Sequence, residues 1–257
     1  MSEFFFSQEF RLAFESYGLG TPLVLIHGYP LSRIIWQALI PHLHGLQVIL
    51  PDVRGFGESQ AAEPGFSMDD LAADLESLLD HLHLEQAFIA GHSMGGYIAL
   101  AFARRAPQRI KGLALIASQA AADPPERRTA RLETAERIAR EGIGFLAEQM
   151  SSALTSQQSL RPQLRALIER QSPKALIGAL RAMAERPDAT DLLRESTFPL
   201  LLLHGQADSL IPIERARQLH ALMPRARLIE LAAVGHMPMM EAPAETAQAL
   251  LEWCSSS

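Results

Sequence analysis

A serine near the middle of the chain stands in a sequence context typical of an activated nucleophile. Ser93 lies in the run 91–96 (GHSMGG), after a predicted strand at 87–90 and directly before a predicted helix that ends at 105. On such a tight strand-to-helix turn the hydroxyl projects above the edge of the sheet, and the flanking glycines leave room for neighbouring backbone. The helix also directs free N–H groups towards an oxyanion formed beside the serine. The alternative, a buried turn with an incidental serine, fits this context less well.

A serine hydroxyl needs an adjacent base, and the chain supplies a histidine and a carboxylate in suitable places. Asp208 follows a predicted strand at 200–203, and His236 follows one at 227–231. Both therefore lie where loops leave the carboxyl edge of a parallel sheet, which is where ligands bind in open α/β folds. The chain order serine, acid, histidine suits this topology. We predict that Ser93, Asp208 and His236 act together; a turn residue and a surface histidine are the alternatives for the latter two.

Two main-chain N–H groups are candidates for binding the oxyanion that this attack would create. One belongs to Met94, directly after the serine, and the other to Tyr29 in the loop 27–30 (HGYP), which follows a predicted strand at 23–26. A donor aimed at a developing oxyanion contributes about 3–4 kcal/mol. Tyr29 and Met94 are also candidate substrate-binding residues. Met237 is a third, because methionines line adaptable apolar pockets, although they fill cores equally well.

The elements that must position these residues are predicted from short apolar runs that alternate with helical patterns. This alternation predicts an α/β fold with a mostly parallel central sheet and helices on both faces. The middle runs are continuous, as in strands buried on both sides, and two N-terminal segments predict a hairpin at one edge of the sheet. The predicted strands lie at 4–6, 10–15, 23–26, 48–50, 87–90, 113–116, 200–203 and 227–231. The predicted helices lie at 68–82, 94–105 and 243–253.

The alternation stops between residues 119 and 196, where the pattern is helical and lacks a convincing strand. We interpret this segment as a helical cap inserted into a core formed by residues 1–118 and 197–257. Within it, the stretch 126–141 carries several arginines and glutamates. We interpret these charges as a solvent-exposed helix face with i,i+4 ion pairs rather than as a binding patch.

The composition of the 257-residue chain is that of a soluble globular protein and excludes several other classes. Hydrophobic residues make up 48% and charged residues 20%, which excludes a disordered chain. A net charge of −6 argues against a nucleic-acid partner. With Cys254 as its single cysteine, the chain forms neither an intrachain disulfide nor a thiolate zinc cluster. It lacks an apolar run of about 20 residues and a secretory signal pattern, so we expect a cytoplasmic protein with no membrane partner.

Histidine pairs elsewhere in the chain do not predict a metal site. His42 with His44, and His81 with His83, lack further ligands at a spacing that would hold a metal ion. We therefore expect surface positions at helix ends for all four. The glycine-rich loops lack the lysine of a phosphate-binding loop, so no nucleotide is expected either.

Taken together, the motifs resemble the α/β-hydrolase family, and in particular its small serine esterase and lactonase branch with a helical cap. The matching motifs are HGxP at 27–30, DxRGxGxS at 52–59, GHSMGG at 91–96, HGxxD at 204–208 and GHxxxxExP at 235–243. The resemblance implies a carboxyl ester hydrolase of carboxylesterase type, which acts on esters of small to medium size through an acyl-enzyme intermediate and needs no metal or organic cofactor. It also implies that Asp52, Arg54 and Ser59 belong to a structural loop rather than to the catalytic group.

Other functions stay open at this point, because this fold hosts many chemistries. The same three residues could open lactones, cleave carbon–carbon bonds or pass an acyl group to peroxide. A serine at position 93 argues against epoxide hydrolases and haloalkane dehalogenases, which resemble this chain but use an aspartate there. The non-enzymatic alternative is a hydrolase-like receptor that binds a small ligand. Acyl length, alcohol identity and oligomeric state are not indicated by any pattern in the chain.

Overall fold

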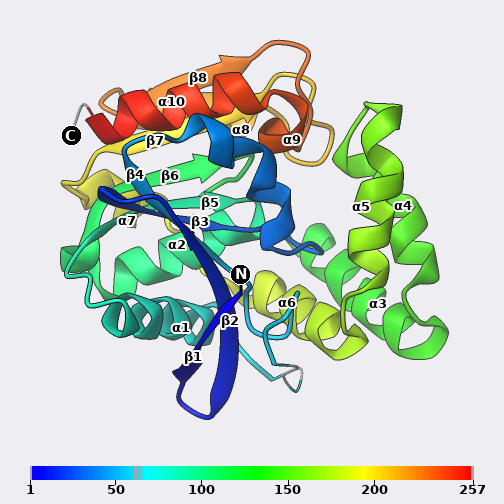
Figure 1. Cartoon of the computed structure of the whole chain (residues 1–257). Coiled ribbons are helices and arrows are strands. Elements are labelled where there is room, and N and C mark those ends of the chain that lie inside the picture. Colours follow the sequence, from blue (N-terminus) through cyan, green and yellow to red (C-terminus); the bar gives the residue numbers. More distant parts are fainter. Residues whose placement is uncertain (1, 61–62, 64, 256–257) are drawn as a thin grey trace.

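The computed structural model describes residues 2–60, 63 and 65–255, and a sheet of eight strands forms its centre (Figure 1). The strands are β1 (Glu3–Ser7), β2 (Phe10–Tyr17), β3 (Thr21–Ile26), β4 (Leu46–Pro51), β5 (Ala87–His92), β6 (Ile110–Ile116), β7 (Leu200–Gly205) and β8 (Arg227–Leu231). They lie side by side in the order β1-β2-β4-β3-β5-β6-β7-β8. The pairs β1–β2 and β2–β4 are antiparallel and the other neighbouring pairs are parallel. The predicted fold class and the hairpin at one edge are confirmed.

Continuous apolar runs form the central strands because both faces of these strands are covered. Every residue of β5 and β7 is buried, and β6 exposes only Lys111. The edge strand β8 is less buried along its whole length. Since β3, β5, β7 and β8 run parallel, their carboxyl ends meet at one edge of the sheet. The four loops that carry the candidate site residues therefore start from the same edge.

Helices cover both faces of the sheet (Figure 1). The helices of the sheet region are η1 (Arg33–His42, a 3-10 helix), α1 (Met68–His81), α2 (Met94–Arg105), η2 (Pro107–Arg109), α8 (Glu214–Leu222), α9 (Pro238–Glu241) and α10 (Pro243–Ser255). The apolar side chains of α1 and α2 belong to one buried cluster, and those of η1 and α10 belong to a second cluster. The three predicted helices are confirmed within a few residues. No helix in the described ranges is long and apolar enough to cross a membrane.

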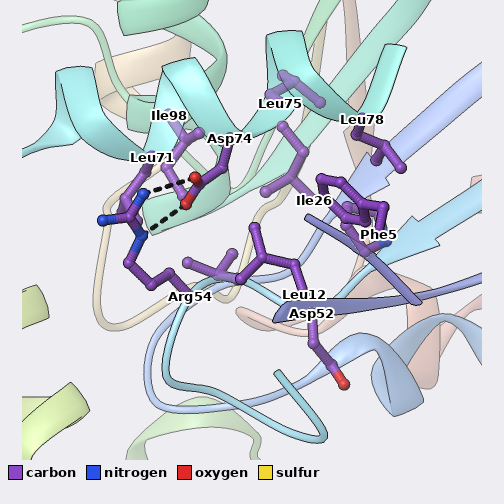
Figure 2. A pocket seen from close by; sticks show the side chains of 12 residues that line it. Phe5, Leu12, Ile26, Asp52, Arg54, Leu71, Asp74, Leu75, Leu78 and Ile98 are labelled. Carbon is purple, nitrogen blue, oxygen red and sulfur yellow. Dashed lines mark hydrogen bonds and ion pairs between the residues drawn. The ribbon is translucent and has the colours of Figure 1, made fainter. Parts of the chain in front are cut away.

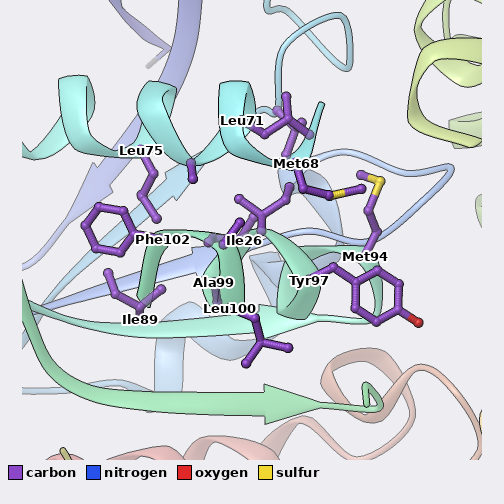
Figure 3. Close-up of a cluster of buried hydrophobic side chains, with 14 of the residues drawn as sticks. Ile26, Met68, Leu71, Leu75, Ile89, Met94, Tyr97, Ala99, Leu100 and Phe102 are labelled. Carbon is purple, nitrogen blue, oxygen red and sulfur yellow. The ribbon is translucent and has the colours of Figure 1, made fainter. Parts of the chain in front are cut away.

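Helix α1 has a strong start signal and a continuous apolar face. Its N-cap Ser67 accepts a hydrogen bond from the Asp70 N–H, while the Asp70 carboxylate accepts one from the Ser67 N–H at 2.7 Å. This reciprocal pair satisfies two donors that a helix start otherwise leaves free. Figure 3 shows Leu75 of α1 pointing towards Phe102 of α2, and Leu71 belongs to the same buried cluster. The packing fixes α2, the helix that follows Ser93.

Between β6 and β7 the described chain forms helices and no strand. These helices are α3 (Pro125–Glu141), α4 (Gly144–Leu154), η3 (Gln158–Leu160), α5 (Arg161–Glu169), α6 (Pro173–Glu185) and α7 (Thr190–Glu195). In Figure 1, α3, α4 and α5 stand together beside one end of the sheet. The helical character predicted for residues 119–196 is confirmed. Its division from the core as a separate cap stays a prediction.

Buried ion pairs hold the loop that follows β4. The Asp52 carboxylate pairs with the Arg33 guanidinium and also accepts the Arg33 main-chain N–H at 2.8 Å. Ser59 donates its hydroxyl to the Asp52 carbonyl at 2.7 Å. Arg54 donates from Nε and Nη2 to the two Asp74 oxygens at 2.8 and 2.6 Å, beside a small cavity of about 30 Å³ (Figure 2). These contacts account for the loop motif as a structural element.

Candidate active site

Ser93 lies between β5 and α2 in a backbone conformation that costs energy. Its φ is +52° and its ψ is −113°, and such a conformation in a non-glycine residue costs about 1–3 kcal/mol, so its surroundings must hold it. The Ser93 N–H donates to the Ile116 carbonyl at 2.9 Å, and the Ser93 carbonyl accepts the Ser118 hydroxyl at 2.7 Å. A Cβ at Gly91 would collide with the backbone of Gly95. The glycines are therefore required for the tight turn that presents Ser93.

His236 and Asp208 form a buried hydrogen-bonded pair. His236 Nδ1 lies 2.7 Å from Asp208 Oδ2, and a carboxylate can only accept, so Nδ1 carries the proton. Asp208 Oδ1 accepts the N–H groups of Leu210 at 2.9 Å and Ile211 at 3.0 Å. Burial acts to raise the pKa of Asp208, but the interactions with His236 and the other donors outweigh it and hold this pKa below its ordinary value. Asp208 is thus ionised at neutral pH, and with the Nδ1 proton held by its carboxylate, Nε2 is the His236 atom placed to exchange a proton.

Ser93 and His236 come from distant segments and line one cavity. Within residues 2–60, 63 and 65–255, no hydrogen bond joins the Ser93 hydroxyl to His236. In enzymes without a bound ligand this bond is often long and tightens only when substrate binds. The structure therefore brings Ser93, His236 and Asp208 together, with His236 hydrogen-bonded to Asp208.

His92 holds the loop of the candidate base, and the sequence analysis did not single it out. Its Nε2 lies 2.8 Å from the main-chain carbonyl of His236, so Nε2 carries a proton and donates it. The two imidazole rings are 4.9 Å apart between centroids. Burial lowers the pKa of His92 well below its usual range and keeps the ring neutral. Its position directly before Ser93 in the motif is the signal that could have identified it.

Two further buried histidines fix the loops on either side of the site. His27 Nε2 accepts the Val53 N–H at 2.9 Å, so its proton sits on Nδ1, which donates to the Gly28 carbonyl at 3.1 Å. Burial lowers the pKa of His27, in keeping with this neutral form. His204 donates from Nε2 to the Ile211 carbonyl at 2.7 Å. The first histidine ties the HGYP loop to the loop after β4, and the second holds the loop that carries the acid.

The two candidate oxyanion donors are free to bind a ligand. Met94 is the first residue of α2, so its N–H has no partner inside the helix. Tyr29 precedes Pro30, with a cis peptide bond between them, and its side chain lines the same cavity as Ser93. Neither N–H donates a hydrogen bond to another of the described residues. Both groups are therefore available to a negatively charged oxygen.

The cavity over Ser93 has a volume of about 260 Å³ and is lined from two sides. Tyr29, Ser93 and His236 line it from the sheet region, while Arg127 and Arg131 of α3 line it from the inserted helices. The remaining lining is largely apolar and comes mostly from the inserted helices, with Tyr97 of α2 and the loop residues Leu210 and Ile211 from the sheet region. The candidate reactive groups and the two arginines thus line the same cavity.

The expectation that the charges of residues 126–141 form a solvent-exposed helix face is wrong for Arg131, whose side chain is 13% exposed, while Arg127 is partly exposed. Arg137 and Arg140 form i,i+4 pairs with glutamates on the outside of α3, as expected. Arg127 and Arg131 instead line the cavity. The side chain of Asp123, shortly before α3, is fully buried, and its carboxylate pairs with both guanidinium groups.

The other candidate residues lie outside the cavity lining. Met237 is fully buried in the apolar cluster of η1 and α10 and does not line the cavity. The side chain of Met94 is also fully buried, beside Tyr97 (Figure 3), so its contribution to the site is its main-chain N–H. Methionines that do line the cavity are Met150 and Met183, from inserted helices. No group of three or more His, Cys, Asp or Glu side chains in the described part of the chain could hold a metal ion.

Comparison with known proteins places this chain in one family. The model of the family described as alpha/beta hydrolase fold matches residues 21–243. The chain is 30% identical to a pimeloyl-[acyl-carrier protein] methyl ester esterase from Photobacterium profundum, over 94% of this chain and 98% of that protein. It is 32% identical to the dihydrolipoyllysine-residue acetyltransferase component of an acetoin cleaving system from Pseudomonas putida, over 90% of this chain, which spans 63% of that protein.

Solved structures agree with this assignment. A thermophilic esterase from Thermogutta terrifontis, solved with malate bound, matches with a TM-score of 0.94 and 37% identity, over 100% of this chain and 98% of that one. A hydrolase from Pseudomonas aeruginosa matches in fold, with a TM-score of 0.90 at 24% identity over 98% of both chains. Because the family model matches most of its length, the chain belongs to the α/β hydrolase fold family.

Proposed function

We propose that this protein hydrolyses carboxylic esters, with Ser93 as the nucleophile, His236 as the base and Asp208 as the acid that orients the base. One observation carries the proposal: the 2.7 Å hydrogen bond between His236 Nδ1 and Asp208 Oδ2. This bond fixes the tautomer whose Nε2 can accept a proton, at the wall of the cavity that also contains Ser93. A histidine that served only to pack a loop would not need a buried, ionised partner.

The proposed reaction proceeds through an acyl-enzyme. His236 Nε2 takes the hydroxyl proton as Ser93 Oγ attacks the ester carbonyl carbon, and the Tyr29 and Met94 N–H groups donate to the oxyanion that forms. His236 then gives the proton to the leaving alcohol as the C–O bond breaks. A water molecule, deprotonated by His236, attacks the acyl carbon, and the proton returns to Ser93 when the acid leaves.

The esterases among the similar proteins support an ester as the substrate. The Thermogutta terrifontis protein, at 37% identity over the full chain, is an esterase. The Photobacterium profundum protein is by name an esterase for the methyl ester of a pimeloyl group on acyl-carrier protein. A cavity of about 260 Å³ suits a substrate of small to medium size, so a carboxylesterase activity on small-molecule esters is part of the proposal.

We also propose that residues 119–196 act as a cap that shapes the substrate cavity. Arg131 of α3, Met150 of α4 and Leu180 of α6 line the cavity together with Ser93 and His236. The candidate reactive groups thus come from the sheet region, and much of the wall comes from the inserted helices. Substitutions in these helices are expected to change substrate preference more than the hydrolysis of a very small ester.

The replacement Ser93→Ala tests the proposed function. We expect it to lower the turnover of ethyl butyrate by about 10⁶-fold, with an unchanged circular dichroism spectrum. Ser255→Ala, at the exposed end of α10, is the matched control and should keep wild-type turnover. A fluorophosphonate probe should label the wild-type protein on Ser93 and leave the Ser93→Ala variant unlabelled. Retention of a tenth of the activity in Ser93→Ala, or a wild-type protein that does not react with the probe, would contradict the proposal and favour a receptor.

A further inference from the structure

Two positive side chains line the cavity over the candidate nucleophile. Arg127 and Arg131 line it, and among the residues that the structure describes no Asp or Glu does. Behind them lies the fully buried Asp123, 2.5 Å from Arg131 Nε and 3.7 Å from Arg127 Nε. Arg186 Nη2 binds the same carboxylate at 2.9 Å. Three guanidinium groups share one carboxylate, so the wall of the cavity has an excess of positive charge.

The two arginines that line the cavity have N–H groups that donate to no other described residue. Arg131 uses Nε for Asp123 and places Nη1 3.3 Å from the sulfur of Met183, a weak acceptor, while its Nη2 donates to no other described residue. Arg127 donates from Nη2 to the Leu210 carbonyl at 3.3 Å. A guanidinium offers five N–H donors in a planar fork that matches a carboxylate in two-point contact. The free donors therefore suit an anionic group of a ligand.

Tyr29 supplies a second, independent sign of a ligand in the same cavity. Its side chain is 7% exposed and lines the cavity, and its hydroxyl has no hydrogen-bond partner among the described residues. Burial raises the pKa of this hydroxyl far above its ordinary value, against the opposing effect of the nearby Arg131. The group therefore stays protonated and can donate. An unpaired buried hydroxyl is unfavourable, so a ligand oxygen that accepts its hydrogen bond gains from it.

We propose that the preferred substrates are monoesters of dicarboxylic acids, whose free carboxylate is bound by Arg127, Arg131 and Tyr29 while the ester carbonyl lies at Ser93. This inference rests on the proposed function, because it names the substrate class of the same site. The apolar lining, Leu180 included, suits the methylene chain between the two ends.

The test compares each monoester with the neutral ester of the same chain length, using the purified full chain at constant ionic strength. The pairs are monoethyl succinate with ethyl butyrate, monoethyl glutarate with ethyl valerate, and monoethyl adipate with ethyl hexanoate. Acid release is followed in a pH-stat. We expect kcat/KM to favour the charged ester roughly 10-fold or more in at least one pair, because hydrogen bonds to a charged group are strong. The chain length with the largest ratio reports the distance between the two subsites.

Variants show whether the arginine wall causes the preference. Arg131→Gln is expected to reduce the charged-to-neutral ratio roughly 10- to 100-fold, mainly through KM for the charged ester. Arg127→Gln, which perturbs the contacts of Asp123 less, tests the same wall if Arg131→Gln fails to fold. Arg140→Gln is the matched control, because Arg140 lies on the same helix, is 65% exposed and, among the described residues, pairs with Glu136 alone.

Two results would overturn the inference. One is a wild-type ratio of one or less in every pair while the neutral esters are hydrolysed, which would leave the proposed function standing. The other is an equal fall of the ratio in Arg127→Gln and in the control Arg140→Gln. Turnover of no ester in any pair would overturn the proposed function and this inference together. A preference that falls in Arg127→Gln or Arg131→Gln and persists in the control supports the carboxylate subsite.

Discussion

The replacement Asp208→Asn keeps the shape of the acid and changes what it offers to the base. Asp208 Oδ1 accepts the N–H groups of Leu210 and Ile211. The amide oxygen of an asparagine must take this position, because an NH₂ group there would face two donors. The NH₂ group then replaces Oδ2, which lies 2.7 Å from His236 Nδ1. His236 must accept at Nδ1 and carry its proton at Nε2, where it cannot take one from Ser93.

The size of the effect follows from this change of tautomer. The same inversion in a serine protease triad lowers kcat by about 10⁴-fold, which corresponds to about 5.4 kcal/mol of transition-state stabilisation at about 1.36 kcal/mol per factor of ten. We expect a similar fall in kcat for ethyl butyrate, with little change in thermal stability. Asp191→Asn, on α7 with a side chain that is 79% exposed, serves as the control and should match the wild type. A folded Asp208→Asn variant with kcat within tenfold of the wild type would refute the tautomer argument.

Three more perturbations have defined outcomes. His92→Phe removes the donor to the main chain of His236 and should lower kcat by about 10²-fold at similar KM, because a misplaced base reacts poorly; His92→Gln, which keeps a donor, should lose less in the same steady-state assay. Arg54→Met leaves Asp74 buried without its partner and should lower the free energy of unfolding in urea by about 3–5 kcal/mol, whereas Arg54→Met with Asp74→Leu should recover most of it. Burial acts to raise the pKa of Asp123, but its arginine partners outweigh this and hold the pKa below the ordinary value. The stability that Asp123 contributes is therefore complete above its unfolded-state pKa of about 3.9 and is lost as pH falls below it. The difference in Tm between the wild type and Asp123→Asn should shrink on acidification from about pH 6 to pH 3, and a constant difference would contradict this.

The parts of the fold and site that rest on local patterns were predictable. Strands β5, β6 and β7 are continuous apolar runs because helices cover both faces of the sheet, and this pattern alone locates them. Ser93 follows β5 and Asp208 follows β7 within a few residues, and His236 follows the less buried edge strand β8 at a similar distance. Parallel strands bring their carboxyl ends to one edge, so the meeting of these loops follows from the order of strands.

The parts that depend on packing between distant elements were not predictable in this way. Helix α3 is so rich in charge that only Ala135 and Ile138 are buried on it, and no apolar stripe marks the side that faces the cavity. The inward direction of Arg127 and Arg131 depends on the buried Asp123, which lies outside the helix pattern. The direction of a single side chain in a loop is equally undetermined by spacing. Met237 accordingly lies in the core although it follows His236.

Tyr29 offers two different groups from one position. Its main-chain N–H lies in the loop after β3, while its phenol ring lines the cavity. Every amino acid except proline carries the main-chain N–H, so directed evolution can exchange the ring and leave that donor in place. Position 29 is therefore a favourable starting point for altering which esters an engineered version accepts, because the main-chain donor to the oxyanion is kept.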